Sequence, residues 1–407
     1  MSTHSSVSPP ASVATAARTP ELMLALATAG FAINFWAWAL LSPLASGLKD
    51  TLHLTSFQQA LIVAVPVIVG ALGRIPVGAL TDRLGGRLMF PAVSFATILP
   101  VLYLGLIGHK SFAGLIVGGF FLGIAGTAFA VGVPMVSGWF VAARRGTAIG
   151  IFGAGMGGTA ISALTTVKLS TAHGFAAPFV LTAVVLAAYG VLAMLLLRDA
   201  PDRAMPTDKL AVSLGAALRL PITWQASALY AVTFGGYVAF SVYLPTYLKS
   251  GYALTQTDAA NRMAGFVLVA VLLRPVGGWL SDRFEAVPVL VGSLSVVVLG
   301  AALQSSTPAL APLGTIAFLS MAAALGAGAG AVFALVAKRS PADMVGGVTG
   351  VVGAAGGLGG FIPPLLMGSI YGRSGSYAIG LMLLSLVALT ALAYTVTIVR
   401  RPMVTHA

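Results

Sequence analysis

The chain has 407 residues, of which 58% are hydrophobic and only 8% are charged, and its mean hydropathy is +0.98. Soluble globular proteins carry about 25% charged residues, so this composition excludes an ordinary soluble domain and predicts a polytopic membrane protein. The formal net charge of +12 does not indicate nucleic-acid binding, because the basic residues lie in short loops between apolar stretches. Cysteine is absent, which excludes disulfides and thiolate metal sites.

Apolar stretches long enough to cross a bilayer, which takes about 20 residues, follow one another along most of the chain. They lie at 22–46, 57–80, 89–107, 113–140, 148–170, 177–197, 223–248, 260–281, 288–305, 308–336, 345–370 and 375–399. The longest polar break, 198–221, separates a six-helix half at 22–197 from a second at 222–400. Residues 1–21, rich in Ser, Ala, Thr and Pro, do not resemble a signal peptide and are interpreted as a disordered tail, and 401–407 form a second tail.

The distribution of basic residues predicts the orientation. An even number of spans puts both termini on one side, and loops on that side carry most of the Lys and Arg, including Arg83, Arg87, Arg144 and Arg145. By the positive-inside rule both termini are cytoplasmic, and the expected location is a bacterial cytoplasmic (inner) membrane. On the opposite side we interpret Lys168, Lys249 and Arg262 as residues that mark the membrane interface rather than attract anions.

An internal duplication connects the two halves. Arg74-Ile-Pro-Val-Gly-Ala-Leu-Thr-Asp-Arg83 and Arg274-Pro-Val-Gly-Gly-Trp-Leu-Ser-Asp-Arg283 match at an offset of 200 residues. Two parallel six-helix repeats are the architecture of the major facilitator superfamily, whose substrate site lies between the halves near the midplane. Asp82, Arg83, Asp282 and Arg283 are expected to cap and latch the cytoplasmic helix ends, a structural and gating role.

Arg74 and Arg274 are predicted to lie at membrane depth. Each stands eight residues before the aspartate of its motif, about 12 Å inside the cytoplasmic boundary of a core about 30 Å thick. A guanidinium stays charged at any working pH, and such a charge is costly inside a membrane. The ten acidic residues all fall in loops or at helix ends. A bound anion is therefore the predicted reason for both arginines.

Glycines repeat with the same offset in the fifth and eleventh stretches. The pairs are Gly146/Gly346, Gly150/Gly350, Gly153/Gly353 and Gly157/Gly357. Small residues let membrane helices pack closely, and glycine also lets backbone N–H groups approach a small ligand. Both interpretations stay open, and the second makes Gly153, Gly157, Gly353 and Gly357 candidates for substrate binding.

The stretch Gly-Ala-Leu-Thr-Asp-Arg-Leu-Gly-Gly-Arg at 78–87 resembles a cytoplasmic loop of the superfamily. More specific motifs are Gly-Ile-Ala-Gly-Thr-Ala-Phe-Ala-Val-Gly-Val-Pro at 123–134, Arg-Gly-Thr-Ala-Ile-Gly at 145–150, Gly-Ala-Gly-Met-Gly-Gly at 153–158 and the glycine run at 353–361. Over roughly 25–395 the chain resembles the nitrate/nitrite porter family of the major facilitator superfamily. It is most similar to the shorter, assimilatory-type bacterial nitrate transporters. The resemblance implies an all-α fold of twelve membrane helices that functions as a monomer in the lipid bilayer without a cofactor.

The resemblance also implies functional residues. The family's substrate-binding arginine pair corresponds to Arg74 and Arg274, and its aromatic walls correspond to Phe129, Tyr230 and Phe234. One departure is that Met156, Gly157 and Gly158 stand where the family often carries an asparagine that helps to read the anion. This departure bears on the preference between nitrate and nitrite.

We expect transport by alternating access, with nitrate or nitrite bound between the two arginines. Proton-coupled carriers commonly use a membrane-embedded acid or histidine, and the five histidines here lie in tails or near helix ends. The sequence therefore favours antiport over proton symport. Two alternatives stay open: a small dicarboxylate (oxalate/formate-type) exchanger, and an anion sensor that moves no substrate. An enzyme is disfavoured, because no nucleophile–base pair, metal-ligand cluster or phosphate loop is present in the sequence.

Overall fold

The computed structural model describes residues 19–201, 210–341 and 344–400. It confirms the predicted spans as 12 helices, or pairs of helices, long and apolar enough to cross a membrane. The first half contains α2 (Thr19–Trp38), α3 (Leu41–Leu52), α4 (Ser56–Leu84), α5 (Gly86–Leu106), α6 (Phe112–Leu122), α7 (Ala128–Trp139), α8 (Ala142–Gly153), α9 (Gly158–His173) and α10 (Ala177–Leu196). The second half contains α12 (Pro221–Tyr252), α13 (Gln256–Phe284), α14 (Ala286–Ser305), α15 (Thr315–Arg339), α16 (Val345–Ser374) and α17 (Ala378–Tyr394).

Short non-α segments interrupt or extend several spans. They are η1 (Gly108–Lys110), η2 (Gly123–Thr127), η3 (Ala154–Gly157), η4 (Leu310–Gly314) and η5 (Thr395–Val399). The η2 and η3 segments are rich in glycine, whose large backbone freedom makes it a poor α-helix former. Both segments lie at the depth of the predicted arginine site, where the sequence predicted continuous helices.

The polar segment between the halves contains a helix. Residues 210–219 form α11 (Leu210–Arg219), which packs against α12 and α16 of the second half. Residues 202–209 of the predicted linker, 1–18 of the first predicted tail and the predicted tail at 401–407 lie outside the described residues. The first helix begins at Thr19, slightly before the predicted start at 22.

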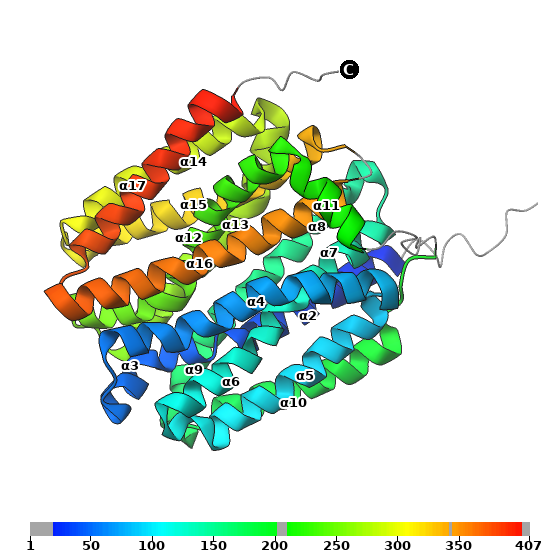
Figure 1. Cartoon of the computed structure of the whole chain (residues 1–407). Helices are drawn as coiled ribbons and strands as arrows, with labels where there is room; N and C mark the ends of the chain where they lie inside the picture. The colour runs from blue at the N-terminus through cyan, green and yellow to red at the C-terminus, as the bar shows by residue number, and fades with distance from the viewer. Residues whose placement is uncertain (1–18, 202–209, 342–343, 401–407) are drawn as a thin grey trace, which may run out of the picture.

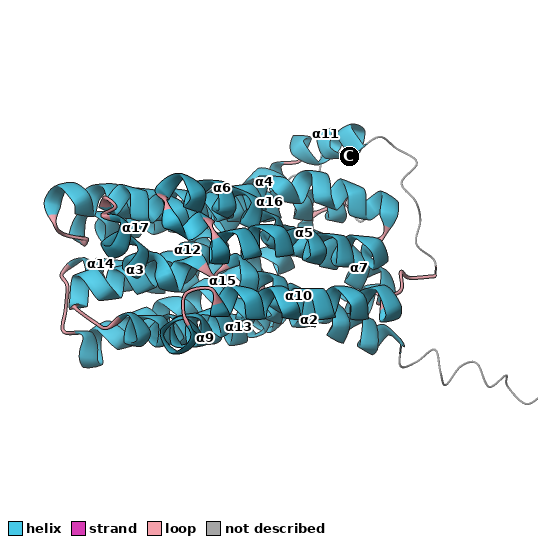
Figure 2. Cartoon of the chain, turned by 90° about the horizontal axis from the view of Figure 1, so that it is seen from below, coloured by secondary structure: helices cyan, strands magenta, loops and turns pink. Residues whose placement is uncertain are grey.

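The two halves meet mainly along two pairs of helices. In Figure 1, α4 of the first half runs beside α16 of the second, and these two helices make extensive contact, as do α9 and α13. Figure 2 shows the membrane helices aligned along a common direction, with α11 at one end of the bundle. Glycines on α16 make the contact close: a Cβ added at Gly357 would lie 2.6 Å from the Cβ of Ala71 on α4. This supports the helix-packing interpretation for that glycine.

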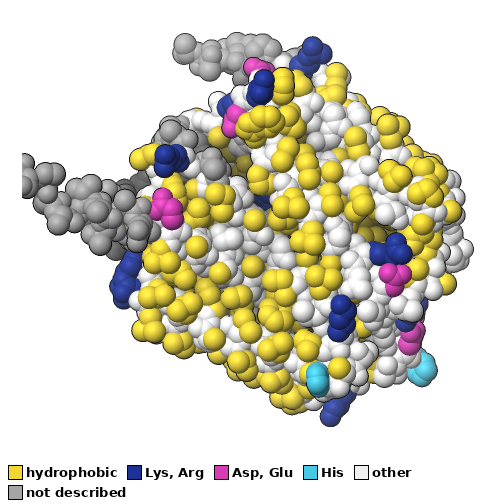
Figure 3. All heavy atoms as spheres, turned by 180° about the vertical axis from the view of Figure 1, so that it is seen from behind, with side chains coloured by type: hydrophobic (Ala, Val, Ile, Leu, Met, Phe, Trp, Pro, Cys, Tyr) yellow, Lys and Arg dark blue, Asp and Glu magenta, His cyan; other side chains and the backbone are white. Residues whose placement is uncertain are grey.

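The outer surface is apolar enough to lie in contact with lipid. A broad hydrophobic area covers the face seen in Figure 3, and the charged side chains gather mainly toward two opposite margins. Leu99 and Leu299, which are related by the 200-residue offset, are 75% and 70% exposed. Such large exposed apolar side chains are expected where lipid tails replace water.

One end of the bundle is closed by polar contacts between the halves. We call this end, which carries the α3–α4 and α12–α13 turns, the far end; the near end carries the α4–α5 and α13–α14 turns. At the far end Ser42 Oγ donates to Val242 O at 2.6 Å, and Gln59 Nε2 donates to Thr246 Oγ1 at 3.1 Å. Further out, Lys249 Nζ lies 2.6 Å from Asp50 Oδ2, and Gln256 Nε2 donates to Pro43 O at 2.7 Å.

Candidate substrate site

Arg74 projects from the middle of α4 and is 8% exposed. Its Nε donates to the carbonyl oxygen of Gly126 in η2 at 3.3 Å, and its Nη1 donates to the carbonyl oxygen of Gly353 on α16 at 2.8 Å. The first bond stays within one half, whereas the second crosses to the other. The guanidinium carbon also lies 5.3 Å from the centroid of the Phe129 ring.

Arg274 occupies the equivalent place on α13 and is 6% exposed. Its Nη2 donates to the hydroxyl of Tyr230 at 2.9 Å, and its Nη1 contacts the thioether sulfur of Met156. Met156 belongs to the first half, so this arginine also reaches across the interface. A Cβ added at Gly153, in the same half as Met156, would lie 3.6 Å from Arg274 Nε.

Aromatic rings join the surroundings of the two arginines. Phe234 lies 5.7 Å from the guanidinium carbon of Arg74 and 5.5 Å from that of Arg274, so one ring faces both charges. Tyr230 stacks parallel to Phe234 at 4.8 Å, as expected for residues one turn apart on α12. Phe333 on α15 completes the group, 4.9 Å from Tyr230 and 5.7 Å from Arg274. Cation–π attraction favours this arrangement.

The predicted glycines occupy different positions relative to the arginines. Gly353 supplies a carbonyl, Gly153 lies against Arg274, and a Cβ at Gly357 would lie 3.5 Å from Arg74 Nη1. A Cβ at Gly157 would meet no atom within 4 Å, and the same is true of Gly150 and Gly350, which lie one turn before Gly153 and Gly353 toward the near end. The helix faces that carry the arginine contacts therefore continue into open space toward the near end.

Two side chains at the site were not named as site residues from the sequence. Phe333 has Val133 as its counterpart at the 200-residue offset, so the internal repeat gives no signal for an aromatic there. Met156 was singled out only as a departure from the family motif, yet it contacts Arg274 directly. The carbonyl of Gly126 lies in η2, an interruption of the fourth span that hydrophobicity does not reveal.

The four residues predicted to latch the near end lie at the ends of α4 and α13. Asp282 Oδ1 is 4.0 Å from Lys338 Nζ of α15, and Arg283 packs over the rings of Trp279 and Phe284. All of these contacts stay within the second half, and the Asp282–Lys338 pair joins α13 to α15. In the first half, the side chain of Asp82 is half-buried and that of Arg83 is exposed.

The electrostatic character of the site follows from its partners. Among the described residues, both guanidinium groups contact carbonyl oxygens, a phenol, a thioether and aromatic rings, all of them neutral. Ion pairs of the described residues lie at the ends of the bundle, as with Lys249 and Asp50. Two positive charges at low exposure with neutral partners attract an anion strongly, because the low dielectric weakens screening. Each guanidinium can offer paired N–H donors to a planar oxyanion.

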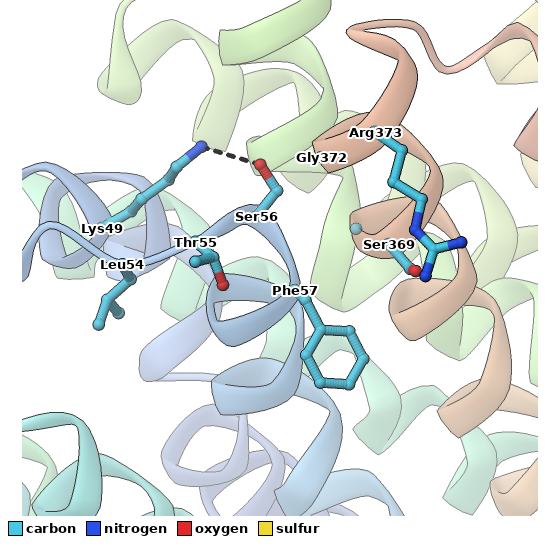
Figure 4. Close-up of a pocket in the computed structure, with 9 residues that line it drawn as sticks. Lys49, Leu54, Thr55, Ser56, Phe57, Ser369, Gly372 and Arg373 are labelled. Atoms are coloured by element: carbon cyan, nitrogen blue, oxygen red, sulfur yellow. Dashed lines mark hydrogen bonds between the residues drawn. The ribbon is translucent and has the colours of Figure 1, made fainter.

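A recess at the far end is separate from this site. Figure 4 shows it between the start of α4 and the end of α16, with Ser56 and Arg373 among its lining residues. Lys49 Nζ donates to Ser56 Oγ at 3.2 Å, and a Cβ added at Gly372 would lie 3.6 Å from that of Ser56. This recess marks the place where the two halves close against each other.

Two six-helix bundles that each bury one arginine at their interface define a membrane transporter of the major facilitator type. The sequence matches the Major Facilitator Superfamily over residues 27–364, and a second match covers 251–406. Among solved structures, a bacterial homolog of the human lysosomal transporter Spinster superposes with a TM-score of 0.73 at 17% identity, covering 93% of this chain and 96% of that one. The human organic anion transporter MFSD10 gives 0.74 at 14% identity, with coverage of 92% and 99%. At these identities both likenesses concern the fold.

Sequence relatives narrow the family. A probable nitrate/nitrite transporter, NarK2, of Mycobacterium tuberculosis is 48% identical over 385 residues, which span 93% of this chain and 96% of the relative. The nitrite extrusion protein of Bacillus subtilis is 36% identical over 373 residues, 91% of this chain and 92% of the relative. The chain belongs to the nitrate/nitrite porter family of the major facilitator superfamily.

Proposed function

We propose that the protein carries nitrate, nitrite or both across the bacterial inner membrane by alternating access, with the anion bound between Arg74 and Arg274. The observation that carries the proposal is the pair of buried guanidinium groups, one from each half, held by neutral partners. The relatives named above, a probable nitrate/nitrite transporter and a nitrite extrusion protein, support the choice of anion.

In this proposal Phe129, Tyr230 and Phe234 form the walls of the site. Their rings already lie within 6 Å of one or both guanidinium carbons, and flat rings suit a flat anion. Gly153, Gly157 and Gly353 leave room for it beside the arginines, whereas Gly357 lets α16 pack closely on α4. The bound anion offsets the repulsion between the two arginines and draws the halves together. Asp82, Arg83, Asp282 and Arg283 then stabilise the near end, which the positive-inside rule assigns to the cytoplasm. We propose that the carrier works as a monomer.

The energetics favour exchange over proton symport. An empty site keeps two repelling charges, so the unloaded carrier should reorient slowly. The carrier should return faster when it has bound an anion from the other side of the membrane. The groups that contact the guanidiniums are carbonyls, rings, a hydroxyl and a thioether, none of which takes up a proton near neutral pH. Nitrate/nitrite antiport follows as the mode of coupling, and the two anion gradients then set the direction of net flux.

The test is uptake of nitrate and nitrite into proteoliposomes by wild type, Arg74→Lys and Arg274→Lys. Lysine keeps the charge but loses the planar fork, so we expect each variant to lose at least about tenfold in activity, equivalent to one charge-assisted hydrogen bond of about 1.5 kcal/mol. Arg262→Lys is the matched control, because Arg262 is exposed and pairs with Asp258 at 3.2 Å. Full activity of either site variant would refute the paired-arginine site.

A small dicarboxylate is the second candidate substrate, because two cations can neutralise a dianion such as oxalate completely. Competition against labelled nitrate distinguishes the candidates. Inhibition by oxalate without transport of nitrate or nitrite would favour the dicarboxylate, whereas nitrite competition with nitrate flux supports the proposal. Anion binding in detergent without any flux in vesicles would instead indicate a sensor.

A further inference from the structure

Met156 links the first half to the second at two points. It lies in the η3 segment between α8 and α9 and is 2% exposed. Its sulfur contacts Nη1 of Arg274 on α13, and the hydroxyl of Tyr237 on α12 lies 3.5 Å from its carbonyl oxygen. Thr159 Oγ1 also donates to that carbonyl at 3.0 Å. The backbone of Met156 is therefore held by hydroxyl groups, while its side chain is directed at an arginine.

The two arginines are held by acceptors of different strength. Arg74 donates to two backbone carbonyls, which are strong acceptors fixed by their helices. Arg274 donates to the phenol of Tyr230 and contacts a thioether, which is only a weak acceptor. The Nη1 group of Arg274 thus has the partner that an incoming oxyanion can displace most easily.

We propose that Met156 is a displaceable cap on Arg274 and thereby a positioning residue that determines how tightly the carrier holds its anion. This inference rests on the proposed function. In the empty site the sulfur keeps the guanidinium in place and contacts Nη1. An oxyanion oxygen then takes this position, forming a charge-assisted hydrogen bond that is stronger than the contact it replaces.

The local structure allows the cap to withdraw. Methionine has an unbranched, flexible side chain that adapts to irregular spaces. Gly155 and Gly157 flank it, and a Cβ at Gly157 would meet no atom within 4 Å, so there is open space beside the segment. A carboxylate at this position would neutralise Arg274 and compete with the substrate, whereas an apolar side chain would leave Nη1 without an acceptor in the empty site.

The inference predicts a specific kinetic change for Met156→Leu, which keeps the volume and removes the acceptor. Without the sulfur, Nη1 of Arg274 has no acceptor in the empty carrier. Anion binding then supplies a hydrogen bond without first displacing another contact. We expect the KM for nitrate exchange to fall about fivefold, which corresponds to about 1 kcal/mol. The maximal exchange rate should stay within about twofold, while net uptake without a trans anion should fall, because the empty site becomes more costly to reorient.

Met135→Leu is the control, since Met135 is also buried but packs against Gly86 on α5, away from the arginines. The nitrate Kd of each purified variant, obtained from the rise in Tm with added nitrate, gives a readout independent of flux. A role in packing alone would change Tm and leave KM and Kd as in wild type.

The outcomes separate the two proposals. If wild type transports nitrate or nitrite and Met156→Leu keeps the wild-type KM and Kd, or raises them, the cap is refuted and the proposed function stands. If wild type neither transports nor binds either ion, the proposed function falls, and the cap falls with it. A lower KM and Kd in Met156→Leu, with Met135→Leu unchanged, supports both.

Discussion

Arg74 on α4 donates through Nη1 to the carbonyl oxygen of Gly353 on α16 at 2.8 Å, a bond that joins the two six-helix halves. Its counterpart at the 200-residue offset, Arg274 with Gly153, also meets across the halves, with a Cβ at Gly153 lying 3.6 Å from Arg274 Nε. Each arginine therefore rests on the glycine-bearing helix of the other half. Any movement that separates α4 from α16 must break the first contact, so the groups proposed to bind the anion also connect the moving parts.

Close contact between α4 and α16 leads to a prediction for Gly357→Ala. Its new Cβ would lie 2.6 Å from the Cβ of Ala71, closer than real Cβ atoms come. The helices must separate, and overpacking of this kind costs about 1–3 kcal/mol. We expect a lower Tm and a loss of nitrate exchange of about tenfold, measured on purified protein and in proteoliposomes. Gly292→Ala on α14 is the control, because a Cβ there meets nothing within 4 Å. Equal behaviour of the two variants would contradict the prediction.

The shared ring at the centre of the site gives a second prediction. Phe234 lies within 6 Å of both guanidinium carbons, so Phe234→Leu removes an aromatic face from both arginines at once. Unlike the Met156 sulfur, this ring is a wall of the site that stays in contact when the anion is bound, so its loss leaves both guanidinium groups less well oriented toward the anion. Each cation–π contact is worth about 0.5–2 kcal/mol, and we expect the KM for nitrate to rise about tenfold. Phe240→Leu on the same helix is the control, since Phe240 packs on Phe266 and Phe318 instead. A KM unchanged by Phe234→Leu would remove Phe234 from the site.

The chemistry of the site predicts a weak pH dependence. Its titratable groups are arginine and tyrosine, whose ordinary pKa values are about 12.5 or higher and about 10. Nitrate stays ionised at neutral pH, so neither partner changes charge between about pH 6 and pH 8. We expect the KM for nitrate exchange to stay within about twofold across that range, measured with equal pH on both sides of the vesicle. A fall in KM of tenfold on acidification would instead indicate a coupled proton and would argue against antiport.

The sequence predicted those features that depend on composition and on the internal repeat. Hydrophobic length located the spans, and the 200-residue offset located Arg74 and Arg274 at equivalent depths, where both are buried. The partners of these arginines could not be found in that way. Backbone carbonyls leave no trace in a sequence, and the one that Gly126 contributes lies in η2, an interruption of the helix that hydrophobic length does not reveal. The contact of Met156 with Arg274 depends on how the two halves pack against each other, and the 200-residue repeat does not determine that packing.

The far end offers a direct test of alternating access. Ser56 starts α4 and Gly372 lies near the end of α16, and a Cβ at Gly372 would lie 3.6 Å from the Cβ of Ser56. That separation falls in the range of about 3.5–4.5 Å that the two Cβ atoms of a disulfide require. The natural chain contains no cysteine that could compete for the introduced pair. Figure 4 shows both positions beside the recess.

We therefore expect the double variant Ser56→Cys with Gly372→Cys to form a disulfide on mild oxidation and to hold the far end closed. Because the anion must leave or enter at that end, nitrate exchange should fall by at least about tenfold and recover on reduction. The two single variants, treated with the same oxidant, control for damage to the protein and should keep their activity. Normal exchange by a double variant whose disulfide is complete by mass spectrometry would mean that the far end need not open. The hypothesis of a rocking movement would then be wrong, even if Arg74 and Arg274 bind the anion.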